Sequence, residues 1–382
     1  MQSGDYRVRE RALCRVMAYR VAVADDSGGW PRVDRLERYA AVVESLALLS
    51  DRRLRDLLDG SAVVGTGIGG TTSVVHVDGT PVFVKQIPLT DLERRPEHVM
   101  STANLFDLPL GCQYGVGSPS FGVWRELAAL VTTSSWVLAG RTAAFPLLYH
   151  WRVLDDRHLA LSDELADVET AVAHWDGSSA VCRRIEAIAG ATAAVTVFLE
   201  YVPFGLEAWM EEHVGGDEPA PEAAITMVHD ALRRDVAFMN AAGVFHFDAH
   251  LGNILTDGHR LYLADFGLAT SPRYELTAAE EAFLARNRSH DPCHTVTRLV
   301  DWLVTHLTGR PHWTERDELV RRWAEGEEPA DVLPAAARII MRYAPIAVVV
   351  NDFHRRLHTE DRSTPYPADE VERACAATGF DL

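Results

Sequence analysis

Residues 244–270 decide the fold, and they read VFHFDAHLGNILTDGHRLYLADFGLAT. Asp248 and Asn253 stand in the first half of this stretch, and Asp265 stands near its end. An Asp-Gly pair stands between two short apolar runs of this stretch, a pattern that predicts a tight β-hairpin. Such a hairpin would bring Asn253 close to Asp265. Phosphoryl transfer requires this residue set: a carboxylate that orients a hydroxyl, and an amide with a second carboxylate that hold magnesium.

The stretch contains the pattern H-x-D-x-x-x-x-N, and Asp-Phe-Gly follows it at the end of an apolar run. The two motifs together resemble the protein kinase-like superfamily, which includes protein kinases and the aminoglycoside and choline phosphotransferases. The resemblance extends over roughly residues 61–310. It implies an α+β, bilobal protein kinase-like fold, with a small antiparallel-sheet lobe that contains a helix and a larger, mostly helical lobe. It also implies that ATP and Mg²⁺ bind between the lobes.

The resemblance gives each polar residue of the stretch a role. Asp248 would be the base that receives the acceptor's proton, and Asn253 and Asp265 would bind the metal. His246 would pack beneath the loop as a structural residue. His250 stands two positions after Asp248, where protein kinases often have lysine and small-molecule phosphotransferases have histidine. It is therefore a candidate for contact with the transferred phosphate.

Upstream, apolar runs within residues 61–87 predict three strands, with a glycine-rich turn between the first two. Glycine lets a backbone close over phosphates without a side chain in the way. By the resemblance, this hairpin covers the nucleotide, and the lysine of the V-x-V-K strand holds its phosphates. The candidate nucleotide-binding residues of this region are Gly65, Gly67, Gly69, Gly70 and Lys85.

The lysine's acidic partner has three candidates. A helix predicted at residues 122–138 begins near Glu126, which stands where the resembled family has its paired glutamate. A polar, Gly- and Pro-rich insertion at residues 88–121 precedes this helix, and it contains the alternatives Glu93 and Glu97.

Two further strands are predicted at residues 145–154 and 193–202. Between them, residues 155–190 form a second, mostly helical insertion. The resemblance implies that the end of the later strand is the hinge whose backbone bonds adenine. Glu200 and Val202 therefore complete the candidate cofactor-binding residues.

Apolar periodicity predicts helices in the rest of the chain, among them 225–239, 276–287, about 316–323 and 334–357, before a charged tail. The helix at 276–287 stands where a protein kinase would have an extended peptide-docking segment closed by A-P-E, and the sequence contains no A-P-E there. Asp291 begins another helix, which ends at Gly309. It is either a plain helix cap or the aspartate that braces the catalytic loop in the resembled family.

These patterns divide the chain into a helical N-terminal extension at 1–60, a small lobe at 61–203 with insertions near 88–121 and 155–190, and a helical lobe at 204–382. The extension contains two predicted helices, at 35–49 and 52–58. They would pack against the neighbouring lobe or serve regulation or dimerisation.

Composition limits the classes of partner. A chain of 382 residues, of which 47% are hydrophobic, can bury a large core. Its net charge of −18 argues against nucleic acid as the main partner. It has no run of about eighteen apolar residues, so no membrane span is expected. The lack of an apolar signal segment and the scattered cysteines predict a cytoplasmic protein with reduced thiols. These cysteines are Cys14, Cys112, Cys182, Cys293 and Cys375.

Three functions fit the sequence. The first is an ATP- and magnesium-dependent phosphotransferase with a small-molecule hydroxyl acceptor. The pattern D-x-H-x-x-N and the lack of A-P-E after Asp-Phe-Gly favour it. The second is a protein Ser/Thr kinase with a protein substrate, which Asp-Phe-Gly-Leu-Ala favours. The third is a nucleotide-binding pseudokinase or scaffold, although such proteins usually lose a charged site residue and this chain keeps the set. The sequence does not identify the acceptor.

Overall fold

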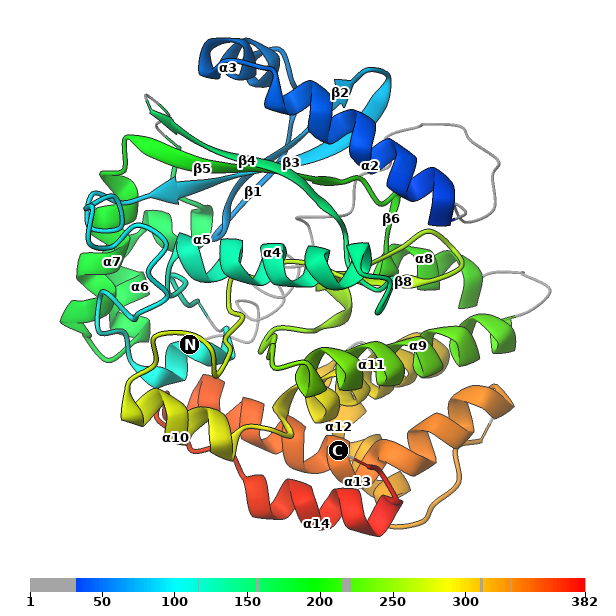
Figure 1. Ribbon diagram of the computed structural model, residues 1–382. Coiled ribbons are helices and arrows are strands. Elements are labelled where there is room, and N and C mark those ends of the chain that lie inside the picture. Colours follow the sequence, from blue (N-terminus) through cyan, green and yellow to red (C-terminus); the bar gives the residue numbers. More distant parts are fainter. Residues whose placement is uncertain are drawn as a thin grey trace.

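The computed structural model describes residues 32–381 apart from 116, 156, 158, 215–220, 310–311 and 331. Expectations for residues 1–31, Cys14 among them, lie outside the described residues. The described chain has an α+β fold in which a five-stranded antiparallel sheet faces a mostly helical half (Figure 1). Among the described residues, no helix is long and apolar enough to cross a membrane.

The sheet has the order β1-β2-β3-β5-β4, with β3 at its centre. Every residue of β5 is buried, because helices cover both faces of the sheet (Figure 1). A strand that is buried on both sides reads as a continuous apolar run, as β5 does. The strands are β1 (Val63–Gly67), β2 (Gly70–Val77), β3 (Thr80–Leu89), β4 (Leu148–Asp155) and β5 (Ala193–Glu200).

Helices α2 (Arg32–Ala47) and α3 (Asp51–Asp59) pack on one face of the sheet, against β2 and β4. Each of these helices packs with an apolar stripe against the sheet, and Leu46 and Leu54 of the stripes are fully buried. On the other face lies α4 (Val123–Leu138), whose first backbone N–H donates to the carboxylate of Glu93. The N-terminal helices are thus part of the same core as the sheet.

The helical half is built around α13, which packs against α9, α11, α12 and α14. Its apolar residues are buried along most of its length. The helices of this half are α8 (Leu206–Val214), α9 (Pro221–Ala241), α10 (Ala278–Arg286), α11 (His290–Thr308), α12 (Trp313–Ala324), α13 (Pro334–Thr359) and α14 (Ala368–Thr378). A second, three-stranded sheet contains β6 (Phe204–Gly205), β7 (Ile254–Thr256) and β8 (Leu261–Leu263).

The structure differs from the sequence expectations at three places. The strand predicted from residue 145 begins only at Leu148, because Pro146 has no N–H to donate to a ladder. The charged tail contains α14, which buries Val371 and Cys375 on one face and leaves its charges on the other. The plain cap reading of Asp291 is also wrong, since Ser289 is the N-cap of α11 and Asp291 lies inside its first turn.

The two insertions pack against each other and form a second apolar cluster beside the sheet. The earlier insertion contributes η2 (Leu110–Tyr114), and the later one contributes α5 (Asp163–Ala166), α6 (Val168–His174) and α7 (Ser179–Ala189). The buried members are Phe106, Leu108, Cys112, Phe121, Leu165, Ala171, Trp175, Ala180, Val181 and Ile185. The prediction of a polar first insertion missed this cluster, because its apolar residues follow no helical or strand period.

Candidate functional site

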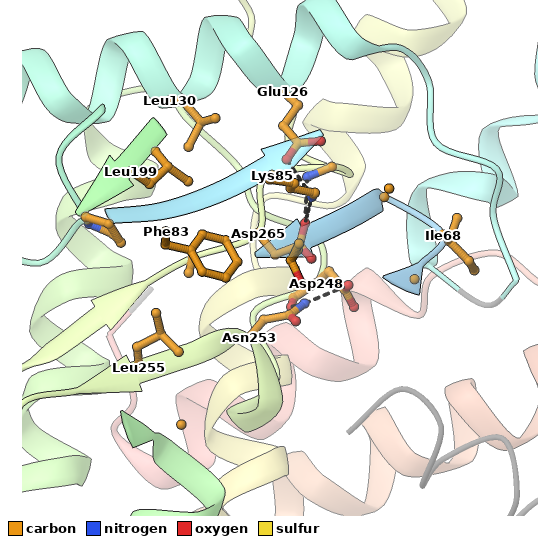
Figure 2. A pocket seen from close by; sticks show the side chains of 18 of the residues that line it. Ile68, Phe83, Lys85, Glu126, Leu130, Leu199, Asp248, Asn253, Leu255 and Asp265 are labelled. Carbon is orange, nitrogen blue, oxygen red and sulfur yellow. Dashed lines mark hydrogen bonds and ion pairs between the residues drawn. The ribbon is translucent and has the colours of Figure 1, made fainter. Parts of the chain in front are cut away.

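A pocket lies between the five-stranded sheet and the β7–β8 hairpin (Figure 2). Four polar residues of the 244–270 stretch line it: Asp248, His250, Asn253 and Asp265. Local turn chemistry forms this hairpin. The Asp257 carboxylate accepts hydrogen bonds of 2.9 Å from the N–H groups of His259 and Arg260, and Gly258 has a φ of +86°. Across the hairpin, Ala264 N–H donates to the carbonyl of Asn253, so the neighbouring Asp265 lies close to Asn253.

The loop before the hairpin is held from below by Asp291. Its carboxylate accepts hydrogen bonds from the backbone N–H groups of His246 (2.6 Å) and Phe247 (2.8 Å). Phe247 has a φ of +62°, which is uncommon for a residue with a side chain, so these bonds stabilise a strained turn. Burial raises the pKa of Asp291, but its bonds to His290 and His246 outweigh burial and leave the pKa below its ordinary value.

His246 is fully buried beneath the loop, where its Nε2 lies 2.9 Å from the carbonyl oxygen of Ala264. Its ring also packs against Phe266. It therefore fastens the loop to the segment that carries Asp265, as expected of a structural residue.

Asp248 projects from this loop into the pocket, with 30% of its side chain exposed. The side-chain amide of Asn253 donates to its Oδ2 (2.9 Å) and to its backbone oxygen (3.0 Å). Burial, and to a lesser extent the charge of Asp265, raise the pKa of Asp248 to about 7. His250 lines the same pocket, with its Nε2 3.8 Å from Asp248 Oδ1 and its Nδ1 bonded to Gly252 N–H.

Lys85 on β3 joins the sheet to the second half of the stretch (Figure 2). Its Nζ lies 2.6 Å from Glu126 Oε1 and 2.9 Å from Asp265 Oδ1. Burial opposes the positive charge, but the two carboxylates outweigh it and raise the pKa of Lys85. Burial raises the pKa of Glu126, while the ammonium of Lys85 outweighs burial at Asp265 and lowers the pKa of that carboxyl.

The geometry separates the three glutamates that the sequence left open. Glu126, in the first turn of α4, is the one that contacts Lys85. Glu93 is buried against Arg184 at 2.9 Å and accepts the first N–H of α4, and Glu97 is exposed.

The glycine-rich turn lies against Lys85. A Cβ on Gly69 would come within 2.7 Å of Lys85 Nζ, and a Cβ on Gly70 within 2.0 Å of a backbone oxygen. Gly67, Gly69 and Gly70 line the pocket, so side chains are excluded where the backbone approaches it. Gly65 was expected to contact nucleotide, but it is not among the pocket-lining residues. It lies in β1 next to a register shift, and its carbonyl accepts from the Thr72 hydroxyl.

No protein-family model matches this chain, and no curated protein matches it. What the pocket can do must therefore be argued from its own groups. The carboxylates of Asp265 and Glu126 both contact the ammonium of Lys85, which leaves excess negative charge, and the carboxyl group of Asp248 lines the same pocket. A bound cation would neutralise this excess. Asp265 and Asn253 offer oxygen ligands at one end of the hairpin, and Mg²⁺ prefers such ligands.

The segment expected to bond adenine is tied to the N-terminal helices. Arg35 of α2 binds the Glu200 carboxylate with Nε (2.8 Å) and Nη2 (2.6 Å), and both side chains are buried. Glu200 and Val202 both line the pocket, and the N–H of Glu200 already donates to the backbone oxygen of Leu147. Sequence reasoning missed Arg35, because nothing local marks an arginine whose partner is 165 positions away.

Arg35→Met should destabilise the protein by about 3–5 kcal/mol, because it leaves the Glu200 carboxylate buried without its partner. The double variant Arg35→Met/Glu200→Gln should lose clearly less, since no buried charge remains. Urea unfolding of each variant measures the free energy of unfolding. Arg53→Met, an exposed arginine on α3, is the matched control. Equal losses for Arg35→Met and Arg53→Met would contradict a stabilising role for the buried pair.

The first insertion also reaches the pocket, which the sequence did not predict. Gly115 has a φ of +86°, and a Cβ there would lie 3.2 Å from Asp248 Oδ1. The hydroxyl of Ser120 donates to the backbone oxygen of Gly267 (2.9 Å), and Gln113 donates to that of Leu268. The insertion therefore packs directly over the Asp-Phe-Gly segment. The only signal in the sequence is the density of Gly and Ser at residues 115–122, which is typical of close backbone approach.

Proposed function

We propose that this chain is an ATP- and magnesium-dependent phosphotransferase with a protein kinase-like fold, which transfers the γ-phosphoryl group to a hydroxyl of a small molecule. One observation carries the proposal. Lys85 contacts both Glu126 and Asp265, 41 and 180 positions away, in the pocket that also holds Asp248 and Asn253. These are the groups that phosphoryl transfer needs, in contact across two halves of the fold.

Each group has a distinct task in this proposal. Lys85, oriented by Glu126, would pair with the phosphates, and Asn253 and Asp265 would hold Mg²⁺, which neutralises charge on the transferring group. Asp248 would accept the proton of the acceptor hydroxyl. Its pKa of about 7 suits a base that works near neutral pH. The glycine turn would cover the phosphates with backbone N–H groups.

The space beside Asp248 favours a small acceptor over a protein substrate. Gly115 of the first insertion approaches Asp248 so closely that a side chain there would touch the carboxylate. Beyond Gly267, the chain turns into helix α10, and the buried Arg125–Glu280 ion pair (2.6 Å) fastens that helix to α4. A peptide substrate would need an open groove and an extended segment beside the base. Both features favour a small acceptor.

The acceptor class can be tested with γ-labelled ATP, Mg²⁺ and the purified full chain. We expect label to enter a small-molecule fraction of cell extract, with magnesium required. Label in the protein fraction alone would replace the small-molecule acceptor with a protein substrate. No transfer to either fraction would count against an active phosphotransferase. Heat-inactivated protein is the control for transfer by the extract itself.

The Lys85–Glu126 pair can be tested by a double-mutant cycle on kcat/KM for ATP. Lys85→Ala and Glu126→Ala should each lower kcat/KM by about 10²-fold, the scale of a misplaced reacting group. The double variant should lose clearly less than the product of the two, because the residues act as one unit. Glu97→Ala removes an exposed glutamate and should change little. Strictly multiplicative losses would show that Glu126 does not orient Lys85.

A further inference from the structure

Three buried histidines meet in the helical half, away from the pocket. His290 and His294 stand four positions apart on α11, which places them on one face of that helix. His354 comes from α13, which packs along α11 (Figure 1). Their exposed fractions are 1%, 7% and 7%. One ring nitrogen from each histidine lies within 4.8 Å of the corresponding atoms of the other two.

Hydrogen bonding does not satisfy this cluster within the described part of the chain. The Nε2 atoms of His290 and His294 are buried and have no hydrogen-bond partner there. A buried polar atom without a partner costs about 1–3 kcal/mol, so two of them in one cluster indicate a missing ligand. His290 Nδ1 lies 3.5 Å from Asp291 Oδ1. Metal-bound histidines commonly have a carboxylate beside the nitrogen that does not bind the metal.

We propose that His290, His294 and His354 bind a divalent transition-metal ion, for which Zn²⁺ is the best fit. Two histidines at i and i+4 on one helix and a third from a neighbouring helix give the nitrogen ligands that Zn²⁺ prefers. Zn–N bonds of about 2.1 Å require nitrogens about 3.4 Å apart in a tetrahedron. One nitrogen of each ring already lies within 4.8 Å of the others, and rotation of the rings would bring the three nitrogens to this spacing. The fourth position is left for a water molecule.

The ion would hold α11 to α13 directly behind the loop that carries Asp248. The His290 ring stacks on Phe247 at 5.0 Å between centroids, and the adjacent Asp291 accepts the N–H groups of His246 and Phe247. A metal at this site would therefore fix the first turn of α11, and with it the strained loop above. This proposal does not depend on the reaction proposed for the pocket.

Metal content of the purified full chain tests the proposal without an activity assay. After chelator treatment and dialysis, titration with Zn²⁺ alone or Co²⁺ alone should show saturable binding of about one equivalent, with tetrahedral d–d bands for Co²⁺. Zn²⁺ should also raise the midpoint of urea unfolding of the depleted protein, because binding to the folded state stabilises it. A depleted wild-type chain that binds neither ion would overturn the site.

Variants assign any bound ion to these ligands. His290→Gln, His294→Gln and His354→Gln should each weaken Zn²⁺ binding by about tenfold or more. His76→Gln, which removes an exposed imidazole from β2, should bind Zn²⁺ as the wild type does. Unchanged affinity in all three cluster variants would place the ion elsewhere and refute the assignment. If a variant does not fold, X-ray absorption of the zinc-loaded wild type decides: imidazole ligands support the site, and oxygen ligands alone refute it.

Discussion

Asp265→Asn is expected to abolish magnesium-dependent transfer, with a loss in kcat of about 10³-fold or more. That is the scale of losing a group that neutralises charge on a transferring phosphate. The substitution keeps the size of the side chain but removes the negative charge that faces Lys85 at 2.9 Å and would bind the metal. Labelled-phosphate transfer, measured across a range of Mg²⁺ concentrations, gives the effect.

Two controls separate this loss from a loss of structure. Lys85 keeps Glu126 as a partner at 2.6 Å, so the variant should retain the far-ultraviolet circular dichroism of the wild type. Asp369→Asn makes the same chemical change at an exposed position on α14 and should leave turnover unchanged. Unchanged turnover in Asp265→Asn would reject the phosphotransferase proposal.

The parts of the site that could be predicted are those that short-range patterns encode. Two short apolar runs around an Asp-Gly turn predicted the β7–β8 hairpin, and a helical stripe predicted that Glu126 lies at the start of α4. The α+β class was expected through the resemblance to the protein kinase-like superfamily, and the described chain has that class. The contact between Lys85 and Glu126 was expected only through the resemblance, and the geometry separates Glu126 from its two rivals.

The parts that could not be predicted are contacts between distant segments. No local period marks Arg35 as the partner of Glu200, or the first insertion as a cover for Asp248. The first insertion has no regular pattern, because its apolar residues lie in a loop that packs against the helices of the second insertion, and neither a period of 3.6 nor one of 2 applies to a loop. The bracing contact of Asp291 was one of two open readings, since a helix-start aspartate has the same sequence context in both.

Asp248→Ala should lower kcat by about 10²- to 10⁴-fold while ATP affinity changes little, which is the usual scale of general-base loss. Asp248 accepts a hydrogen bond from Asn253 and does not share the contacts of Lys85, which are with Glu126 and Asp265. Removing the base should therefore affect the chemical step more than nucleotide binding. Single-turnover transfer and equilibrium ATP binding measure the two separately. An equal loss of ATP binding would show that Asp248 supports the metal or the fold instead.

The role of Asp248 as a base can also be tested through the pH dependence of the rate. Because the base must be ionised and its pKa is about 7, kcat/KM should rise with pH up to about 7 and level off above it.

Burial raises the pKa of Asp248 in the folded state, so the folded chain holds the proton to higher pH than the unfolded chain does. Its contribution to stability is present below pH 4 and is lost as pH rises through 7. In Asp248→Asn, the rise of kcat/KM with pH should therefore disappear. At pH 8, this variant should unfold at a temperature equal to or higher than that of the wild type. A lower unfolding temperature would mean that activity was lost through misfolding.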